Sequence, residues 1–216
     1  MNVLQIVFLI VYFALLVTYM ALKKHQKSRF RSVVKMSMSF LFVVAGIYST
    51  ILFPTAIALL LCFGLFAGAI GDYFLLYIST SRHKFHCGVY SFLVCNILLY
   101  IYSIMKYGFI WWTLLIWVGF LALELTVQAK GLLRFGKSSV PLNIYVSAIT
   151  LRGATGIGVM TLGGGAVAFG LGSLLFMISD FLLGFYSFKW NKWVISALNS
   201  LTYFGGLLLI ALSPIL

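Results

Sequence analysis

The stretch GAVAFGLGSLLFMISDFLLGFY, residues 165–186, contains a single charged side chain, that of Asp180. A helix of roughly 20 mostly apolar residues spans the hydrocarbon core of a bilayer. We therefore interpret residues 165–186 as a membrane-spanning helix. A carboxylate at membrane depth costs several kcal/mol unless it is protonated, paired or facing water. Asp180 is for this reason a candidate functional residue.

The whole chain has the composition of an integral membrane protein. Hydrophobic residues make up 63% of it, charged residues make up 8%, and the mean hydropathy is +1.12. Such a chain has too few polar side chains to cover a water-soluble globule. We predict an all-α fold in which eight transmembrane helices form one domain, residues 1–216. The expected spans are Asn2–Leu22, Val33–Ser49, Thr55–Ile78, Phe85–Met105, Phe109–Ala129, Val140–Met160, Gly165–Tyr186 and Val194–Ser213.

The basic residues predict the orientation of this bundle. Lys and Arg in short loops favour the cytosolic side of a membrane. The loops on one side contain Lys106 alone, whereas the connections on the other side contain Lys23, Lys24, Lys27, Arg29, Arg31, Arg82, Lys84, Lys130, Arg134, Lys137, Lys189 and Lys192. Both termini are therefore expected on the non-cytosolic side of a bacterial cell membrane. The positive charge suits anionic membrane lipids, and nucleic acid is not an expected partner because no aromatic stacking surface accompanies the basic loops.

The acidic residues of the chain are Asp72, Glu124 and Asp180, and each lies inside an apolar run. Each precedes the predicted end of its helix by about five or six residues, which corresponds to a depth of roughly 8–9 Å. Since the three helices run in the same direction, the pattern predicts a polar cavity that opens toward the cytosolic leaflet. Other polar residues expected near it are Lys35, Asn96, Tyr100, Asn143, Tyr145 and Arg152. An alternative for Glu124 is that it only neutralises Arg152 or Lys35.

Two of the acidic positions have similar surroundings in the sequence. The segment 71–75, GDYFL, resembles 179–183, SDFLL, four helices further along the chain. The similarity indicates two parallel four-helix repeats, whose aspartates would meet across a pseudo-twofold axis normal to the membrane. Glycines at 64, 68 and 71 indicate close packing of the third helix against a neighbour.

No metal or cofactor site is predicted. The cysteines at 62, 87 and 95 lie in or near apolar helices without metal-type spacing. The histidines at 25, 83 and 86 lie in or beside the basic loops, too far from the membrane interior to form a buried zinc site.

Several motifs resemble the YhhN-type lysoplasmalogenase family of integral membrane vinyl-ether hydrolases. The segment 170–183, GLGSLLFMISDFLL, is similar to the family's Ser-Asp signature, and 71–76, GDYFLL, is similar to its Gly-Asp element. Phe85 through Tyr100, the pair Pro141 and Tyr145, and the segment 202–204 resemble further family elements. The resemblance covers nearly the whole chain in the expected order.

The chain departs from this family pattern at four positions. Asn96 stands where the family usually has His, and Arg152 where an apolar residue is usual. Leu207 replaces a common Gln, and Met36 replaces a Pro. The two aspartates are retained.

The resemblance implies hydrolysis of the vinyl ether bond of lysoplasmalogens, which releases a fatty aldehyde and a glycerophospho-alcohol. This chemistry suits two carboxyl groups, one protonated to supply a proton and one ionised to stabilise the cation or activate water. We expect Asp72 and Asp180 to form this catalytic pair, with neither role assigned. The expected substrate-binding residues are Lys35 for the phosphate group, with Asn96, Tyr100, Glu124, Asn143, Tyr145, Arg152 and Ser179.

Two other classes of function are compatible with the same residues. A proton-coupled carrier could use the intramembrane carboxyl groups to bind and release protons. A non-catalytic lipid-binding member of the family is the other alternative, and the Asn96 and Leu207 departures favour it.

Overall fold

The computed structural model describes residues 3–23, 29–76, 81–131, 135–188, 190 and 192–216. This part of the chain forms eight α-helices and no strand. The helices are α1 (Val3–Leu22), α2 (Arg29–Leu52), α3 (Ala56–Leu75), α4 (Arg82–Tyr107), α5 (Thr113–Ala129), α6 (Ser139–Met160), α7 (Gly165–Phe188) and α8 (Trp193–Leu212). Short 3-10 turns, Gly136–Ser138 and Ser213–Ile215, precede α6 and follow α8.

All eight predicted helices are present, and the predicted all-α bundle is confirmed. The largest differences are at two helix starts. Helix α2 begins at Arg29 instead of Val33, and α5 begins at Thr113 instead of Phe109. The delay of α5 follows from Gly108, whose φ of 84° ends α4 in a conformation that favours glycine. The predicted termini Asn2 and Ile78 lie outside the described residues.

Local sequence explains other helix ends. Helix α2 ends at Leu52, two residues before Pro54, because a proline cannot continue a helix. Thr55 then caps α3, and its side-chain oxygen accepts a hydrogen bond from the backbone N–H of Ala58 at 3.2 Å. Ser81 caps α4 in the same way.

Six of the described helices, α1, α2, α3, α4, α7 and α8, are long and apolar enough to cross a membrane by length and composition. Helix α5 has 17 residues, and α6 contains Asn143 and Arg152 among its apolar residues. Large apolar side chains such as Ile10, Phe40 and Ile51 point outward from the bundle and are exposed. Such a surface suits lipid better than water, so the chain is a multi-pass membrane protein.

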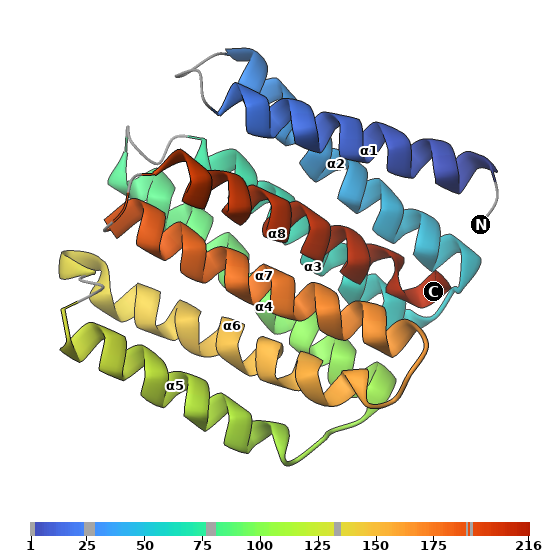
Figure 1. The fold of residues 1–216 in the computed structure, drawn as a ribbon. Coiled ribbons are helices and arrows are strands. Elements are labelled where there is room, and N and C mark those ends of the chain that lie inside the picture. Colours follow the sequence, from blue (N-terminus) through green and yellow to red (C-terminus); the bar gives the residue numbers. More distant parts are fainter. Residues whose placement is uncertain (1–2, 24–28, 77–80, 132–134, 189, 191) are drawn as a thin grey trace.

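The helices pack in the same order in the two halves of the chain. In the first half α3 packs mainly on α4, and in the second half α7 packs mainly on α8. Across the halves α2 contacts α8, and α6 contacts α4. Helices α1 and α5 lie at opposite edges of the bundle (Figure 1). This arrangement is the one that two parallel four-helix units would produce.

The backbones of α7 and α8 approach closely at a pair of glycines. A Cβ atom added to Gly172 would lie 2.6 Å from the carbonyl oxygen of Gly206, and one added to Gly206 would lie 2.7 Å from that of Gly172. Both positions exclude any side chain, because backbone on the facing helix cannot move aside. The pair therefore holds α7 against α8 at a point about two helical turns before Asp180 along α7.

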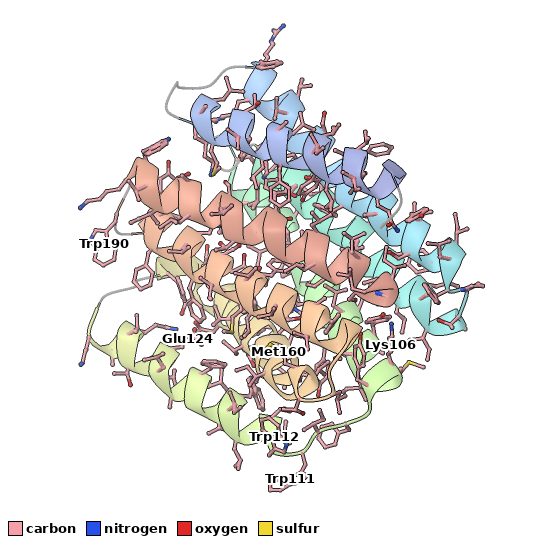
Figure 2. All side chains as sticks on the ribbon, turned by 45° about the vertical axis from the view of Figure 1, so that its right-hand side comes forward. Lys106, Trp111, Trp112, Glu124, Met160 and Trp190 are labelled. Atoms are coloured by element: carbon pink, nitrogen blue, oxygen red, sulfur yellow. The ribbon has the colours of Figure 1, made fainter. Side chains whose placement is uncertain are left out.

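The α4–α5 and α7–α8 connections lie at opposite ends of the bundle. Figure 2 shows Lys106 at the end of α4, and Trp111 and Trp112 of the first connection, far from Trp190 of the second. Tryptophan at both ends is typical of the two interfacial belts of a membrane protein. We call the end that carries Trp190 and the α1–α2 connection the basic end.

Candidate functional site

A cavity of about 510 Å³ lies between α1, α2, α3, α7 and α8 toward the basic end, and Phe92 of α4 forms part of its wall. Asp72 and Asp180 both line it. We call this cavity the polar chamber. Its other charged and hydrogen-bonding lining residues are Tyr19, Lys23, Arg31, Lys35, Ser179, Tyr186, Ser187, Ser196, Asn199, Ser200 and Tyr203. The structure thus brings the two predicted catalytic aspartates, from separate helices, to one cavity.

Asp72 is held by side chains from two neighbouring helices. Its Oδ1 lies 2.8 Å from the Nζ of Lys35 on α2. Its Oδ2 accepts hydrogen bonds from the hydroxyl groups of Ser39 and Tyr203, both at 2.7 Å. Its side chain is almost fully buried, with 1% of the residue exposed. An ammonium partner and two hydroxyl donors all stabilise the charged form of this carboxyl group.

The ammonium group of Lys35 is occupied by its contacts with Asp72. The Nζ of Lys35 also donates to the backbone carbonyl of Asp72 at 3.3 Å. Within the described residues this is the one pair of Lys or Arg with a carboxylate. Lys35 is therefore engaged in the chamber wall, and the cations of the chamber without a carboxylate partner in the described chain are Lys23 and Arg31.

Asp180 has a different environment from Asp72. Its Oδ2 accepts one hydrogen bond, at 2.8 Å, from the hydroxyl of Tyr145 on α6. No Lys or Arg of the described chain lies within ion-pair distance of it. Asp180 and Tyr145 also line a second cavity, of about 80 Å³, whose walls are otherwise almost entirely apolar.

This second cavity, which we call the apolar pocket, lies between α4, α5, α6 and α7. Its walls include Phe85, Val89, Leu142, Ile149 and Phe181. Asp180, Phe92, Leu75, Leu183 and Ser187 belong to the walls of both the apolar pocket and the polar chamber. Asp180 is the acidic residue at the junction of the two cavities. Asp180 thus has an almost entirely apolar cavity on one side and a polar cavity on the other.

Asn96 and Arg152 form a separate buried group. The Nε of Arg152 donates to the Oδ1 of Asn96 at 2.6 Å, and the Nδ2 of Asn96 donates to the carbonyl oxygen of Phe92 at 2.8 Å. The guanidinium carbon of Arg152 lies 4.5 Å from the ring centroid of Phe176. Both terminal nitrogens of Arg152 are buried without a hydrogen-bond partner. Neither Asn96 nor Arg152 lines the polar chamber or the apolar pocket.

The carboxyl group of Glu124 is hydrogen-bonded to a neutral side chain. Its Oε1 accepts a hydrogen bond from Gln128 at 2.7 Å, and Gln128 also donates to the Oδ1 of Asn143 at 3.1 Å. Glu124 lines the apolar pocket and lies on the edge helix α5 (Figure 2). It forms no ion pair with Arg152 or Lys35. The structure therefore does not support the alternative that Glu124 neutralises one of these cations.

The three carboxyl groups do not share the predicted offset from their helix ends. Glu124 lies five residues before Ala129, as predicted, but Asp72 lies only three residues before Leu75 and Asp180 lies eight before Phe188. The difference arises because α3 ends earlier, and α7 later, than their apolar patterns indicate. The aspartates nevertheless reach the same chamber.

The remaining predicted residues are Ser179, Tyr100 and Asn143, and only Ser179 lines one of the two cavities. The backbone carbonyl of Ser179, next to Asp180, accepts a hydrogen bond from Asn199 at 2.7 Å, and Ser179 lines the polar chamber. Tyr100 is partly buried and lines neither cavity. Asn143 likewise lies outside both linings.

A comparison with family models gives one match, to the YhhN family, over residues 30–214. The chain belongs to the YhhN family. No curated protein and no solved structure gave a significant match. The segment that matches the YhhN model includes Asp72, Asp180 and the residues that hydrogen-bond to them, whereas α1 and Lys23 lie before it.

Sequence reasoning missed several residues that contact the aspartates in this YhhN chain. Ser39 lies one helical turn after Lys35, so the spacing of Lys35 and Ser39 places both on one face of α2. Tyr203 lies 131 residues from Asp72 along the chain, and no local pattern connects the two positions. Lys23 had been counted only among the loop cations, although its side chain lines the polar chamber.

Proposed function

We propose that this YhhN-family protein hydrolyses the vinyl ether bond of lysoplasmalogen-like lysophospholipids within the membrane. The observation that carries the proposal is the position of Asp180 between the apolar pocket and the polar chamber that also contains Asp72. A lysophospholipid has the same division, with one hydrocarbon chain and one polar headgroup. Bound with its chain in the apolar pocket, it would present the bond between these two parts to Asp180.

The reaction needs one proton donor and one water molecule. A carboxylic acid protonates the outer alkene carbon, which converts the vinyl ether to an oxocarbenium ion. Water adds to the carbon bonded to oxygen and returns a proton to a carboxylate. The resulting hemiacetal then breaks its C–O bond to the glycerol and releases the aldehyde and the glycerophospho-alcohol. The sum is vinyl ether plus water giving aldehyde plus alcohol.

The surroundings of the two aspartates support a division of roles. Asp72 has a cation and two hydroxyl donors, so we assign it the ionised role of stabilising the cation and accepting a proton from water. Asp180 has one hydroxyl donor and no cation in contact, and it borders the apolar pocket. We assign it the role of the acid that protonates the alkene. Tyr145 positions Asp180, and Tyr203 positions Asp72.

The test is aldehyde release from a lysoplasmalogen by protein purified in detergent. We expect Asp72→Asn and Asp180→Asn each to lower the rate by at least about 100-fold, the lower end of general acid–base contributions. Lys106→Gln, at the opposite end of the bundle, serves as the control and is expected to retain the wild-type rate. A well-folded Asp180→Asn or Asp72→Asn variant that turns over at the wild-type rate would contradict the proposal.

The same preparation separates the proposal from its alternatives. Lysolipid binding without aldehyde release would favour a non-catalytic member of the YhhN family. Proton-dependent solute uptake into proteoliposomes would favour a carrier. We further propose the bacterial cytoplasmic membrane as the location, with the basic end of the bundle at the cytosol, because the short basic loops gather there.

A further inference from the structure

The polar chamber carries more positive charge than its acidic residues balance. Lys23, Arg31 and Lys35 line it with two acidic residues, of which Asp72 is paired with Lys35 and Asp180 has no Lys or Arg of the described chain within ion-pair distance. Arg31 has no hydrogen bond or carboxylate partner in the part of the chain that the structure describes. Lys23 and Arg31 therefore remain as two cations without a counter-ion in a cavity that is closed off on several sides by helices.

Neutral groups hold Lys23 in this position. Its Nζ donates to the carbonyl oxygen of Ser196 at 2.5 Å and to the hydroxyl of Ser200, both on α8. The Nζ also lies 5.2 Å from the ring centroid of Tyr19. Two acceptors leave one N–H of the ammonium group for a further partner. The cation is thus fixed beside the chamber, although no acidic residue requires it there.

We propose that Lys23 and Arg31 form a binding subsite for the phosphate group of the lipid headgroup, at the basic end of the polar chamber. The inference rests on the proposed function for the identity of the ligand. An ammonium and a guanidinium group bind phosphate oxygens through charge-assisted hydrogen bonds, and arginine can do so with two parallel bonds. The Asn199 amide lines the same chamber; its Nδ2 donates one N–H to the Ser179 carbonyl oxygen, which leaves the other N–H for a phosphate oxygen. The sequence pointed to Lys35 for this role, but Lys35 is engaged with Asp72.

Burial and nearby charges act on the ammonium group of Lys23. Burial in the chamber disfavours its charged form most, repulsion from Lys35 and Arg31 adds to this effect, and attraction by Asp72 at longer range opposes it. The pKa of Lys23 is consequently lowered to about 7. A phosphate anion placed between Lys23 and Arg31 would relieve the repulsion between the two cations.

The experiment measures equilibrium binding to the full chain in a phosphate-free maltoside detergent. The ligand is a saturated 1-O-alkyl lysophosphatidylcholine, which has no alkene to protonate and so is not turned over. The comparison ligand is a 1-O-alkylglycerol with the same chain and no phosphate. We expect Arg31→Gln and Lys23→Gln each to weaken binding of the phospholipid by about tenfold or more, and to change binding of the alkylglycerol by less than about twofold.

Control variants separate charge from structure. Arg31→Lys is expected to keep most of the affinity for the phospholipid, and Lys106→Gln to leave it unchanged. Equal losses for both ligands in Arg31→Gln and Lys23→Gln, or no loss for either, would overturn the subsite. Arg31 is only partly buried and has no hydrogen-bond or carboxylate partner among the described residues, so Arg31→Gln provides a test even if Lys23→Gln does not fold.

Inorganic phosphate distinguishes a lipid-borne phosphate from a free one. Competition at millimolar concentrations, lost in Arg31→Gln, supports the subsite. Inorganic phosphate that binds far more tightly than the phospholipid would overturn the assignment to a headgroup. The outcome is also independent of catalysis, because the saturated ligand is never cleaved. Charge-dependent binding without aldehyde release from a lysoplasmalogen would leave the subsite intact and reject only the proposed reaction.

Discussion

Asp72 and Asp180 occupy equivalent places in the two halves of the chain but have different partners. In each half the helix before the aspartate supplies a partner, Lys35 from α2 for Asp72 and Tyr145 from α6 for Asp180. The difference between an ammonium and a hydroxyl partner gives two similar carboxyl groups different electrostatic environments. The asymmetry of the partners thus supports the asymmetry of the proposed roles.

The isolated acidic residues were visible in the sequence because a carboxylate in an apolar run is rare. Of their partners, Ser39 and Tyr203 were not predicted, because serine and tyrosine occur throughout the chain and carry no such signal. Tyr203 is one of 12 tyrosines. Lys35 was identified, but its contact with Asp72 depends on how α2 rotates against α3, which the sequence alone does not specify.

The pKa of Lys23 leads to a prediction about pH. Burial, followed by repulsion from Lys35 and Arg31, lowers this pKa to about 7, whereas the unfolded chain would have the ordinary value of 10.5. A bound phosphate favours the charged lysine, so phospholipid binding takes up a proton above pH 7. We expect the affinity for the saturated ether lysophosphatidylcholine to be constant below about pH 6 and to fall by up to about tenfold per unit above pH 7.

Binding titrations between pH 5.5 and 8.5 check this expectation. Lys23→Gln should remove the pH dependence, and Arg31→Gln should move it to higher pH by removing one repelling charge. The groups that face Lys23 are Tyr19 on α1, Arg31 and Lys35 on α2, Asp72 on α3, Tyr186 on α7, and Ser196 and Ser200 on α8. An unchanged slope in Lys23→Gln would assign the titration to one of these other groups.

At the scale of helices, the apolar pattern predicted every element and most boundaries to within a few residues. The glycines of α3 were correctly predicted to pack closely, since Gly64, Gly68 and Gly71 all face α4. The observed starts of two helices differ from the predicted ones. Helix α2 starts earlier because it continues into the polar segment at Arg29, and α5 starts later because the chain turns after Gly108 before the helix begins. Hydropathy marks the apolar core of a span and not its polar ends.

The contact between α7 and α8 predicts unequal effects at two adjacent glycines. Gly206→Ala would place a Cβ atom 2.7 Å from the backbone oxygen of Gly172, so the helices must separate. We expect it to lower the free energy of unfolding by about 1–3 kcal/mol. Gly205→Ala has no atom within 4 Å of the added Cβ and is the matched control. It should be neutral or stabilise the helix by up to about 1 kcal/mol.

Thermal unfolding of the two variants in the same detergent measures this difference. A lower melting temperature for Gly206→Ala than for Gly205→Ala is expected. Equal melting temperatures would show that α7 and α8 are not in backbone contact at this point.

At the scale of the whole molecule, the loop charges and the helix packing both indicate that successive helices run in opposite directions. The number of helices and their alternation followed from composition. Which helices lie at the edges did not, because α1 is the most apolar helix and the hydrophobicity of α5 falls within the range of the helices at the centre (Figure 1). The structure places them there because α1 contacts mainly α2, and α5 mainly α6. The hydrophobicity of a helix therefore does not determine whether it lies at the edge or at the centre of the bundle.

The orientation of the molecule can be measured by cysteine labelling. In a variant with Cys62, Cys87 and Cys95 replaced by Ser, we introduce a single cysteine by Lys106→Cys or by Lys130→Cys. A membrane-impermeant maleimide added to intact bacterial cells should label the first variant and not the second, because only the loop that contains Lys106 is expected outside the cytosol. The reverse pattern would invert the assigned topology. Labelling of both after lysis confirms that each thiol is accessible.

The edge position of α1 places one of the two residues of the proposed headgroup subsite outside the segment that the YhhN model matches. Lys23 follows a helix that lies before the YhhN match, whereas both aspartates lie inside it. Under the proposed function, a relative with another first helix would keep the two aspartates and Arg31 but change the cation at position 23. Exchanging that single segment between relatives would then alter the lipid preference and leave the aspartates in place.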